Sequence, residues 1–561
     1  MPDEAEETAD PAAGSTGRNS TLVAAGILLS RVSGLLRESA VAAFLGNGLA
    51  VDAFTAALRI PNTLQNLLGE GVLSASFIPV YSRLLAEGRR EEAGRLAGAV
   101  AGLLALLTGV LAVAGVVFAG PITRVIAFGY SGERLELTVR LVRILTPGIG
   151  LLVLSAWCLG VLNSHRRFFL AYVAPVLWNV AQIAVLVTLG LTAYRGGGEA
   201  ARSSLAVGLA WGTVAGGLLQ FGVQVPSVLR LVPGLRLRAE TRSAPVRRVL
   251  GAFGPVVGAR GVVQLSAYFD IFLASFLVIG APAALRYSQV LYLLPISLFG
   301  MSIAAAELPE LSSAGPADRR ALARRLDGGL ARIAFFVLPT AVAYVVVGDL
   351  VVAALFQRGA FGPAATMQVW IVLAGYAVGL PASGASRLYQ SALYGTGDAR
   401  TPSRVAVVRV AVAAAVGVLL MLQLDRVGVT AGGLAQLGDL PALRPLPQAV
   451  RTAGADPPRL GALGLTLASG AAAWVELVLL RRAVTRRIGL TGLGGGFFGR
   501  IAVATAAAGG AALLLRPLTG GLPPLLAAPS VLTASGAVYL AAGSALRLPE
   551  ALAVRRRLLG R

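Results

Sequence analysis

The chain has 561 residues, of which 56% are hydrophobic and only 14% are charged. A soluble globular protein carries about 25% charged residues, so this composition excludes an ordinary soluble domain. Apolar runs of about 20 residues recur along the chain, and each is long enough to cross a hydrocarbon core of ~30 Å as a helix. The sequence therefore predicts an all-α polytopic membrane protein.

The net charge is +22, and the basic residues are all arginines. These arginines lie between apolar segments and not on one domain face, which indicates membrane topology and no nucleic-acid partner. Cys158 is the only cysteine and His165 the only histidine. We therefore expect no intrachain disulfide, no metal site, no cofactor and no Ser-His-Asp triad. We interpret His165, beside Arg166 and Arg167, as a loop residue.

The N-terminal residues 1–20 combine acidic and small polar residues, which predicts a disordered cytoplasmic tail. No basic stretch precedes an apolar run that ends in a small-residue cleavage site, so we expect no cleavable signal peptide.

Apolar segments define about fourteen candidate transmembrane helices. They fall at 21–46, 50–82, 92–119, 137–163, 168–193, 203–231, 248–280, 284–312, 328–347, 364–394, 402–423, 460–480, 498–515 and 523–546. An even number places both termini on one side of the membrane. Alternate loops are rich in arginine, with 122–143 as the exception, and the positive-inside rule then predicts that both termini are cytoplasmic.

A weak internal repeat indicates how these helices are grouped. AAFLGNGLAVDAFTAALRIPNTL is echoed by LASFLVIGAPAALRYSQVLYLLPISL, and each has a Phe-Leu pair, a turn, a helix with polar residues and then an intramembrane proline, Pro61 or Pro295. Such repeats are typical of transporters with two lobes around a central site. We expect two six-helix lobes around a central cavity and two C-terminal helices. The boundaries are 21–232 for the N-lobe, 245–484 for the C-lobe, 497–547 for the last two helices and 548–561 for a cytoplasmic tail.

One connection, 424–459, is longer than the others and rich in Gly and Pro. We predict an irregular extracytoplasmic loop. Since loops tolerate insertions, an insertion without a role is the simpler interpretation of this segment.

The segment 30–79 carries several charges within two apolar helices. Each charge near the middle of a bilayer costs roughly 2.5–3.5 kcal/mol, so such residues usually face a bundle interior or a watery cavity. Seven residues make nearly two helical turns, so polar residues seven positions apart lie on the same side of a helix. Asp52, Arg59, Asn66 and Glu70 share one line of the second helix, Arg31 and Glu38 share a line of the first, and Ser30 and Arg37 share the adjacent line. Pro61 is expected to kink the second helix.

The arginines of this segment indicate the kind of ligand. A guanidinium is always charged and presents a rigid fork of donors that suits phosphate or carboxylate. Arg31, Arg37 and Arg59 therefore favour a ligand with such a group. However, three acidic residues (Glu38, Asp52 and Glu70) balance these charges, so ion pairs between helices that only fix packing remain an alternative.

Other polar side chains lie in later apolar segments: Asn179, Arg260, Gln264, Asp270, Glu307, Arg387 and Tyr389. Asp270 is a candidate cation ligand or proton site, with pairing to Arg260 or Arg409 as the alternative. Glu307 and Glu310 lie near the predicted cytoplasmic end of a helix, where they could be solvated.

At these residues the sequence resembles the MurJ/MviN family, the bacterial lipid II flippases of the MOP exporter superfamily. The matching pieces are SRVSGLLRE, VDAF, RIPN, GEGVLSASFIPVYS, NSHRRFFLAYVAPVLWN, FDIFLASFL, LFQRGAF and YGTGDARTP. The resemblance implies fourteen helices, with two lobes around a V-shaped cationic cavity. It implies that the protein is a flippase and not an enzyme. Such a flippase moves the undecaprenyl-pyrophosphate-linked disaccharide-pentapeptide from the cytoplasmic to the outer leaflet by alternating access.

The resemblance also implies the residues that bind the substrate. They are Ser30, Arg31, Arg37, Glu38, Asp52, Arg59, Asn62, Glu70 and Arg387, with Arg260 as a candidate replacement for arginines that the family has elsewhere. The chain departs from the family at Gln65, Gln289 and Val290, where members carry basic or acidic residues. Asp270 matches a sodium-ligand aspartate of some members, but the segment 402–423 lacks the Asn and Asp partners of such a site.

The expected partners are lipid II and membrane lipids, with the cell-wall synthesis machinery as a further candidate, and the expected state is a monomer in the cell (inner) membrane. Two alternatives remain open. One is a MOP-type exporter of another lipid-linked saccharide or an amphipathic cation. The other is a membrane scaffold that transports nothing, which would tolerate loss of Arg31, Arg37 and Arg59.

Overall fold

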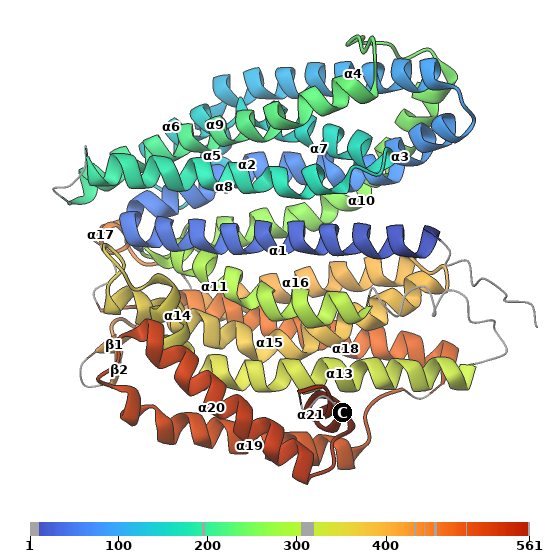
Figure 1. Ribbon diagram of the computed structural model, residues 1–561. Coiled ribbons are helices and arrows are strands. Elements are labelled where there is room, and N and C mark those ends of the chain that lie inside the picture. Colours follow the sequence, from blue (N-terminus) through green and yellow to red (C-terminus); the bar gives the residue numbers. More distant parts are fainter. Residues whose placement is uncertain are drawn as a thin grey trace, which may run out of the picture. The chain divides into compact units, whose positions relative to one another are not determined.

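The computed structural model describes residues 11–192, 197–304, 319–430, 433–442, 444–453, 457–489 and 491–558 (Figure 1). Side chains are described throughout these ranges except at 11–25, 27, 259–260, 262–263, 265–267, 319 and 558. The chain forms two compact units. Unit 1 comprises Met1–Phe44, Ala53–Ala127 and Ser131–Tyr268, and unit 2 comprises Leu45–Asp52, Phe128–Tyr130 and Phe269–Arg561.

Helices make up nearly all of the described chain. Those from the N-terminus to the end of α10 are α1 (Pro11–Leu45), α2 (Leu49–Leu68), α3 (Glu70–Ala86), α4 (Arg90–Val117), α5 (Ala119–Ile126), α6 (Gly132–Leu145), α7 (Gly148–Ser164), α8 (Phe168–Leu191), α9 (Glu199–Leu231) and α10 (Ala244–Ala274). The later elements are α11 (Ala281–Pro295), the π-helix η1 (Ile296–Met301), α13 (Arg319–Val346), α14 (Gly348–Phe356), α15 (Pro363–Gly395), α16 (Arg400–Leu424), β1 (Val427–Thr430), β2 (Gly433–Gln436), α17 (Gln448–Thr452), α18 (Gly461–Ile488), α19 (Gly495–Leu515), the short helix η2 (Pro517–Thr519), α20 (Pro524–Ala545) and α21 (Pro549–Leu558).

The predicted all-helical membrane architecture is confirmed. Among the described residues, ten helices are long and apolar enough to span a bilayer, and the α6–α7 pair, bent by 43°, makes up to eleven. The other three predicted segments coincide with α1, with α2 and α3, and with α10. Their charged residues, such as Arg37, Asp52 and Asp270, lower the hydropathy of these segments.

The second predicted segment consists of two helices. α2 continues through Pro61 and ends at Leu68, and Gly69 separates it from α3. A Cβ atom at Gly69 would overlap the backbone oxygen of Gln65, so the chain turns there because glycine permits the close approach. Glu70 therefore begins a new helix, and the predicted polar line of Asp52, Arg59, Asn66 and Glu70 does not run along one continuous helix.

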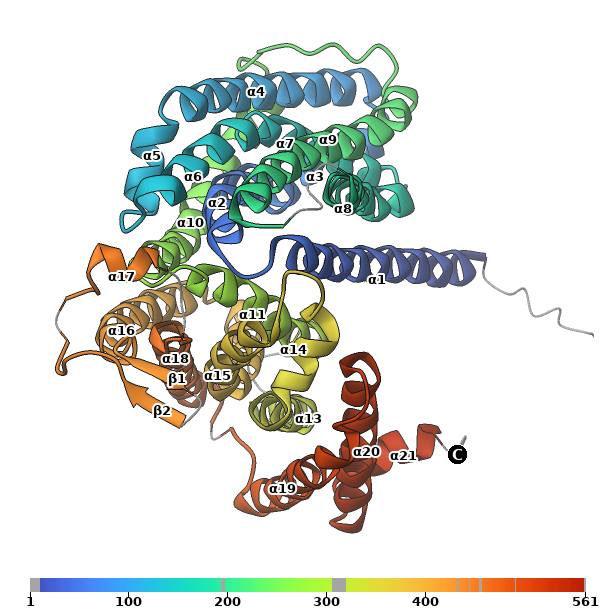
Figure 2. The same cartoon turned by 90° about the vertical axis from the view of Figure 1, so that its left-hand side faces the viewer.

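In unit 1, α9 packs against α6, α7 and α8, and α4 packs against α7. In Figure 2, α7 and α9 are neighbours and lie beneath α4. Small residues let these helices approach closely, since a Cβ at Gly216 would lie 2.9 Å from the Trp178 oxygen. Across the α7–α9 contact, Gln220 and Gln224 donate hydrogen bonds of 2.9 and 2.7 Å to the Ser155 hydroxyl.

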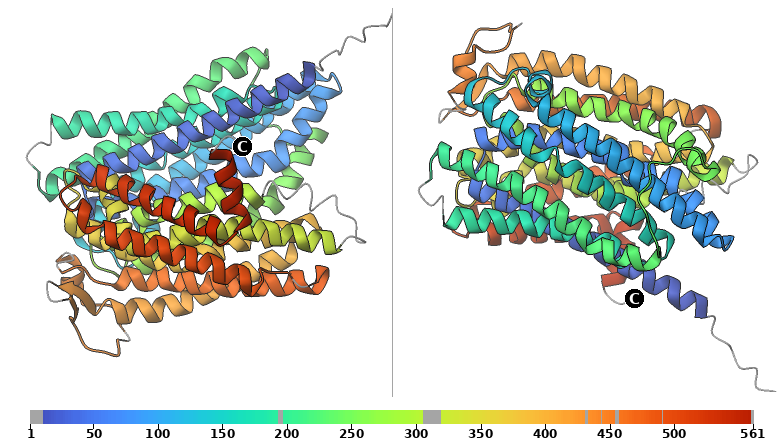
Figure 3. Two further views of the ribbon diagram at one scale, coloured as in Figure 1. Left: turned by 60° about the horizontal axis from the view of Figure 1, so that its bottom comes forward. Right: turned by 90° about the horizontal axis from the view of Figure 1, so that it is seen from above.

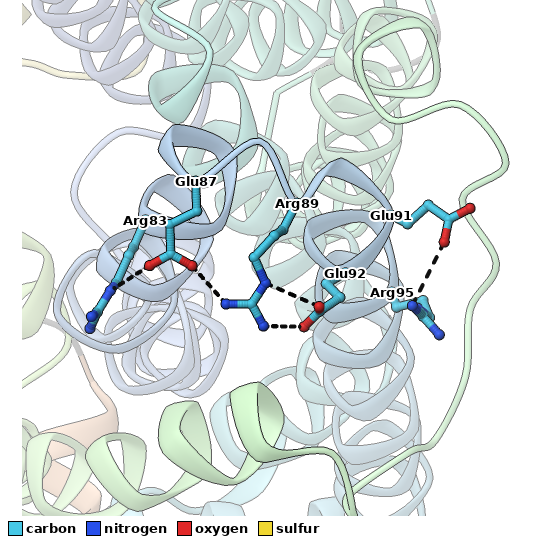
Figure 4. Close-up of polar contacts among 6 residues, drawn as sticks. All are labelled: Arg83, Glu87, Arg89, Glu91, Glu92 and Arg95. Carbon is cyan, nitrogen blue, oxygen red and sulfur yellow. Dashed lines mark hydrogen bonds and ion pairs between the residues drawn. The ribbon is translucent and has the colours of Figure 1, made fainter.

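The turn between α3 and α4 is fixed by exposed ion pairs (Figure 4). Glu87 accepts hydrogen bonds from Arg83 at 3.0 Å and Arg89 at 2.6 Å, and Arg89 also pairs with Glu92 at 2.7 Å. The network fixes the geometry of a turn that the sequence assigns to the cytoplasm. Exposed pairs of this kind add only about 0–1 kcal/mol each to stability.

The chain that leaves α9 runs along the glycine face of α4. The Arg238 amide donates a hydrogen bond of 3.3 Å to the Gly98 oxygen. A side chain at Gly98 would overlap the Arg236 oxygen, and one at Gly102 would lie 2.5 Å from the Arg238 oxygen. Glycines four residues apart thus let the connecting backbone lie directly on this helix.

In unit 2, α18 packs between α15 and α16, and α13 packs against α15 and α19. Figure 2 shows α13, α15, α16 and α18 nearly end-on as neighbouring helices. A Cβ at Gly379 would lie 2.5 Å from Gly470 Cα, so α15 and α18 approach backbone to backbone. The last helices join this unit through Tyr539, which donates a hydrogen bond of 2.7 Å to the Phe335 oxygen, and through the Arg516–Asp349 pair at 2.6 Å. Figure 3 shows α21 turning away from the direction of α20.

The structure differs from two sequence-based predictions about irregular segments. Residues 11–20 begin α1 and are not a disordered tail; Pro11 has a backbone suited to the first helical position. The segment 424–459 contains an antiparallel hairpin, with Val427 opposite Gln436, and the helix α17. β-Branched Val427, Val429 and Thr430 favour a strand, and this local signal outweighs the Gly and Pro content. The predictions for residues 1–10, Glu307 and Glu310 lie outside the described residues.

Candidate functional site

A polar cluster joins α1 to α8 inside unit 1, and Arg37 is at its centre. Arg37 Nη1 donates a hydrogen bond of 3.1 Å to Asn179 Oδ1, and Arg37 Nη2 pairs with Glu38 Oε1 at 2.6 Å. The guanidinium also stacks over the Trp178 ring, 4.8 Å from its centroid. A carboxylate, an amide and an aromatic face therefore fix the position of this one cation.

Asn179 connects this cation to the backbone of α1. Its Nδ2 donates a hydrogen bond of 2.8 Å to Ser33 Oγ and a longer one of 3.5 Å to the Ser30 oxygen. Asn179 lies one turn after Pro175, within the apolar helix α8. Ser30 thus takes part in the cluster through its carbonyl group.

The cluster is removed from solvent. The Glu38 side chain is 5% exposed and the Arg37 side chain 15% exposed. Burying a charge costs several kcal/mol unless a partner offsets it, so removal of either partner is expected to be far more costly than loss of a surface ion pair. In functional terms, the guanidinium is oriented in advance, which suits it to recognise a phosphate or carboxylate.

The other predicted residues of unit 1 are distributed differently. Arg31 is exposed and Glu38 is buried, so the two residues of this predicted line have different surroundings, and Glu38 pairs with its sequence neighbour Arg37. Arg59 and Asn62 are half-buried on α2, and Arg59 interacts electrostatically with Tyr268 of α10. Glu70 is exposed in the first turn of α3, where a negative charge favours the helix dipole. The side chain of Arg260 lies outside the described residues.

Asp52 belongs to unit 2 and caps a helix there. Its two carboxylate oxygens accept hydrogen bonds from the amides of Gly280, at 2.8 Å, and Ala283, at 2.9 Å. These amides lie at the start of α11, where unsatisfied donors and the positive end of the helix dipole favour a carboxylate. The cap accounts for the complete burial of Asp52 and favours a structural role for it.

A second polar cluster lies in unit 2, where three helices meet. Glu476 of α18 accepts hydrogen bonds from Arg409 of α16 at 2.7 Å and from Gln390 of α15 at 2.9 Å. Glu476 is 2% exposed. Arg387, which is exposed, reaches Gln390 at 3.5 Å, at the edge of this cluster. Asp270 is exposed at the end of α10, and the Arg409 side chain pairs with Glu476.

The sequence signals for these clusters were uneven. The sequence shows Asn179 only as one polar residue of an apolar segment; Trp178 is not among the candidates, and Ser33 is missed because short hydroxyl side chains are frequent in membrane helices. Glu476 was also missed, although a single acid within AAAWVELVLL is a strong indication of a buried partner.

His165 lies in the turn between α7 and α8, as predicted, and it has a defined partner. It follows α7, and its Nε2 lies 3.0 Å from the hydroxyl of Tyr81 on α3. Burial and the nearby positive charge of Arg90 lower the pKa of His165. Within the described part of the chain, no group of three His, Cys, Asp or Glu side chains could hold a metal ion.

Comparison with solved structures shows the class of protein. The chain superposes on a lipid II flippase MurJ in an inward closed conformation with a TM-score of 0.72 and 21% identity, covering 96% of this chain and 100% of the other. An inward-facing MATE-family multidrug resistance transporter of the MOP superfamily matches with a TM-score of 0.59 and 17% identity, over 82% and 94% of the two chains. This protein therefore has the fold of a multi-pass MOP-type membrane transporter.

Sequence comparison shows the family. The family described as lipid II flippase MurJ matches residues 41–440. The lipid II flippase MurJ of Burkholderia cenocepacia is 33% identical over 71% of this chain and 75% of its own length, and a probable lipid II flippase MurJ of Rhizobium meliloti is 31% identical over 71% and 74%. The chain belongs to the MurJ lipid II flippase family. Family membership confirms the sequence-based prediction of a membrane transporter that is not an enzyme.

Proposed function

We propose that this chain moves lipid II from the cytoplasmic to the outer leaflet, with the Arg37 cluster as part of its pyrophosphate site. Membership of the family supports lipid II as the substrate. The role of the cluster is supported by the largely buried guanidinium of Arg37, which lies between Glu38, Asn179 and Trp178. A cation held in place before the ligand arrives loses little conformational entropy on binding.

The exposure of the other predicted residues indicates which of them can contact the substrate. Arg31, almost two turns before Arg37 on α1, is exposed and is therefore accessible to a ligand. Arg59, Asn62, Glu70, Arg260 and Arg387 are further candidate contacts. Asp52 contributes by fixing the start of α11 and not by touching the substrate.

Alternating access is the proposed transport cycle, in the cell (inner) membrane with both termini cytoplasmic. The membrane potential can drive the return of cationic side chains, since it contributes ~2.3 kcal/mol per charge per 100 mV. Asp270 remains the ion or gating candidate. However, the segment 402–423 within α16 lacks the Asn and Asp side chains that such a cation site would use.

A cell-based complementation experiment tests this proposal. Cells depleted of their own lipid II flippase should survive when they express this chain, and Arg37→Ala should abolish rescue. Arg487→Ala is the matched control, because Arg487 forms an exposed pair with Asp398 at 2.6 Å and lies outside the cluster. Rescue by Arg37→Ala as complete as by the parent chain would rule out the pyrophosphate role.

The likeness to MATE-family transporters favours one alternative, the export of another amphipathic molecule. Failure of the stably inserted parent chain to rescue would favour that alternative or a scaffold that transports nothing. Tolerance of cells to an amphipathic cation then separates these two, because only an exporter raises it.

A further inference from the structure

A pocket lies on one face of the last turns of α18, and none of its lining residues belongs to either polar cluster. It is an open hollow of about 480 Å³ and is lined by Val478, Arg481, Arg482, Thr485 and Arg486. The spacings of three, four, seven and eight residues from Val478 place these side chains on one side of the helix. Three guanidinium groups therefore gather at one shallow hollow.

The arginines of this pocket have few internal partners. Arg481 donates a hydrogen bond of 3.0 Å to the Thr491 oxygen, which fixes its side chain at the edge of the hollow. Among the described residues, no carboxylate lies within ion-pair distance of Arg482 or Arg486. Arginines four residues apart repel each other on a helix, and a bound anion would relieve this repulsion.

The position along the helix indicates where such an anion would come from. α18 has 28 residues and is about 42 Å long, so its ends extend beyond a hydrocarbon core of ~30 Å. The arginines occupy the last two turns, at the depth of lipid headgroups. One and two turns before them, on the same face, Val478 and Trp474 are both 44% exposed. The face is thus apolar along the membrane and cationic at its end.

We propose that this face of α18 binds one anionic phospholipid, with its phosphate between Arg481, Arg482 and Arg486 and an acyl chain along Val478 and Trp474. The guanidinium fork suits phosphate oxygens, and the exposed Trp474 supplies a flat contact for the chain. The site is independent of the proposed transport function, since none of its residues belongs to either polar cluster.

Arg487 provides the control that the structure offers. It has the same charge and is adjacent to Arg486, but nine residues from Val478 place it on the opposite side of the helix, where it pairs with Asp398. Arg487→Gln therefore changes the net charge of this helix end as much as Arg482→Gln or Arg486→Gln does, without touching the pocket.

Fluorescence quenching by brominated lipids tests the proposal. The full chain is placed in phosphatidylcholine nanodiscs that contain a minor fraction of phosphatidylglycerol or phosphatidylcholine with brominated acyl chains, and the signal of Trp474 is isolated by difference from Trp474→Phe. Brominated phosphatidylglycerol should quench this signal at a lower mole fraction. Arg482→Gln and Arg486→Gln should each reduce the preference about fivefold, the change that corresponds to ~1 kcal/mol per basic residue near an anionic lipid. Arg487→Gln should keep it.

Four results would overturn the proposal: relief of quenching by inorganic phosphate, equal quenching by both lipids, an equal loss in Arg487→Gln, or stronger relief of quenching by unlabelled undecaprenyl pyrophosphate than by unlabelled phosphatidylglycerol. The last result would assign the face to the substrate lipid. Relief by inorganic phosphate in the buffer would assign it to a soluble anion. Quenching by brominated phosphatidylcholine in every variant shows that the protein is correctly inserted.

Discussion

Arg37 and Glu38 are neighbours in the sequence, and they form an ion pair of 2.6 Å in the interior of unit 1. Adjacent residues on a helix point in directions about 100° apart, so a pair between them requires both side chains to bend toward a common point. Asn179 and Trp178 of α8 both contact the Arg37 guanidinium of this pair. The pair is thus held by a second helix, and α8 is as much a part of the candidate site as α1.

We expect Asn179→Ala to reduce lipid II transport about 10- to 100-fold. The variant removes the hydrogen bond to Arg37 Nη1, and a bond to a charged group contributes ~1.5–3 kcal/mol. The measurement is rescue of flippase-depleted cells over a range of expression levels. Asn163→Ala is the control, because Asn163 Oδ1 has no hydrogen-bond partner among the described residues. Equal effects of both variants would show that the contact to Arg37 is unimportant.

Glu476→Gln should lower the thermal unfolding temperature in detergent. The substitution leaves Arg409, whose side chain is 30% exposed, without its charged partner. Breaking a fully buried pair costs ~3–5 kcal/mol, and the partial exposure of Arg409 should bring the loss below that range. The double variant Glu476→Leu with Arg409→Met should recover much of it. If the double variant is less stable than Glu476→Gln, the cluster contributes more than charge compensation.

Gly98→Ala should displace the chain that follows α9 and destabilise the protein by about 1–3 kcal/mol, the usual cost of overpacking. A methyl group there would overlap the Arg236 oxygen. Gly109→Ala is the matched control on the same helix, because its Cβ would meet no atom of the described residues within 4 Å and alanine favours a helix. Limited proteolysis between residues 232 and 243 measures the displacement. Equal cleavage of both variants would contradict a backbone docked on α4.

Asp425 should make stability depend on pH. Burial raises the pKa of this carboxyl group to about 6, despite the nearby Arg459, Arg426 and Arg451. Because the folded state binds the proton more tightly, this stabilisation is complete below pH ~4, the unfolded pKa, and is lost as pH rises through about 6.

The comparison with Asp425→Asn isolates that effect, because the amide does not titrate. The unfolding temperature of the parent chain should fall relative to the variant between pH ~4 and 6 and then stay constant. The full difference is on the order of 3 kcal/mol. A difference that is independent of pH would show that Asp425 is not desolvated.

The fold could be predicted from the sequence because hydropathy acts over whole helices. Fourteen apolar segments each coincide with a helix or a pair of helices, and the mistakes are local. The break at Gly69 depends on a single close approach to the Gln65 oxygen, and the hairpin at 427–436 depends on β-branched residues within a Gly-rich segment. Neither feature can be detected from hydropathy averaged over about twenty residues.

The candidate site could be predicted only in part. Spacing on one helix places Arg31 and Glu38 on one line and Arg37 on the adjacent line, but it does not show that Glu38 pairs with Arg37 while Arg31 is exposed. Which side chains meet depends on their length and on the contacts with α8. Neither can be predicted from the spacing of residues along α1 alone. Asp52 shows the same limit, because its carboxylate serves the amides of Gly280 and Ala283, more than 200 residues away in the sequence.

Transport of lipid II by the purified protein in vesicles tests the central claim most directly. Fluorescent lipid II is placed in the inner leaflet, and its appearance outside is followed with a membrane-impermeant quencher. The parent chain and Arg487→Ala should translocate it at equal rates, and Arg37→Ala should fall to the rate of empty vesicles. Translocation by Arg37→Ala at the parent rate would contradict the account.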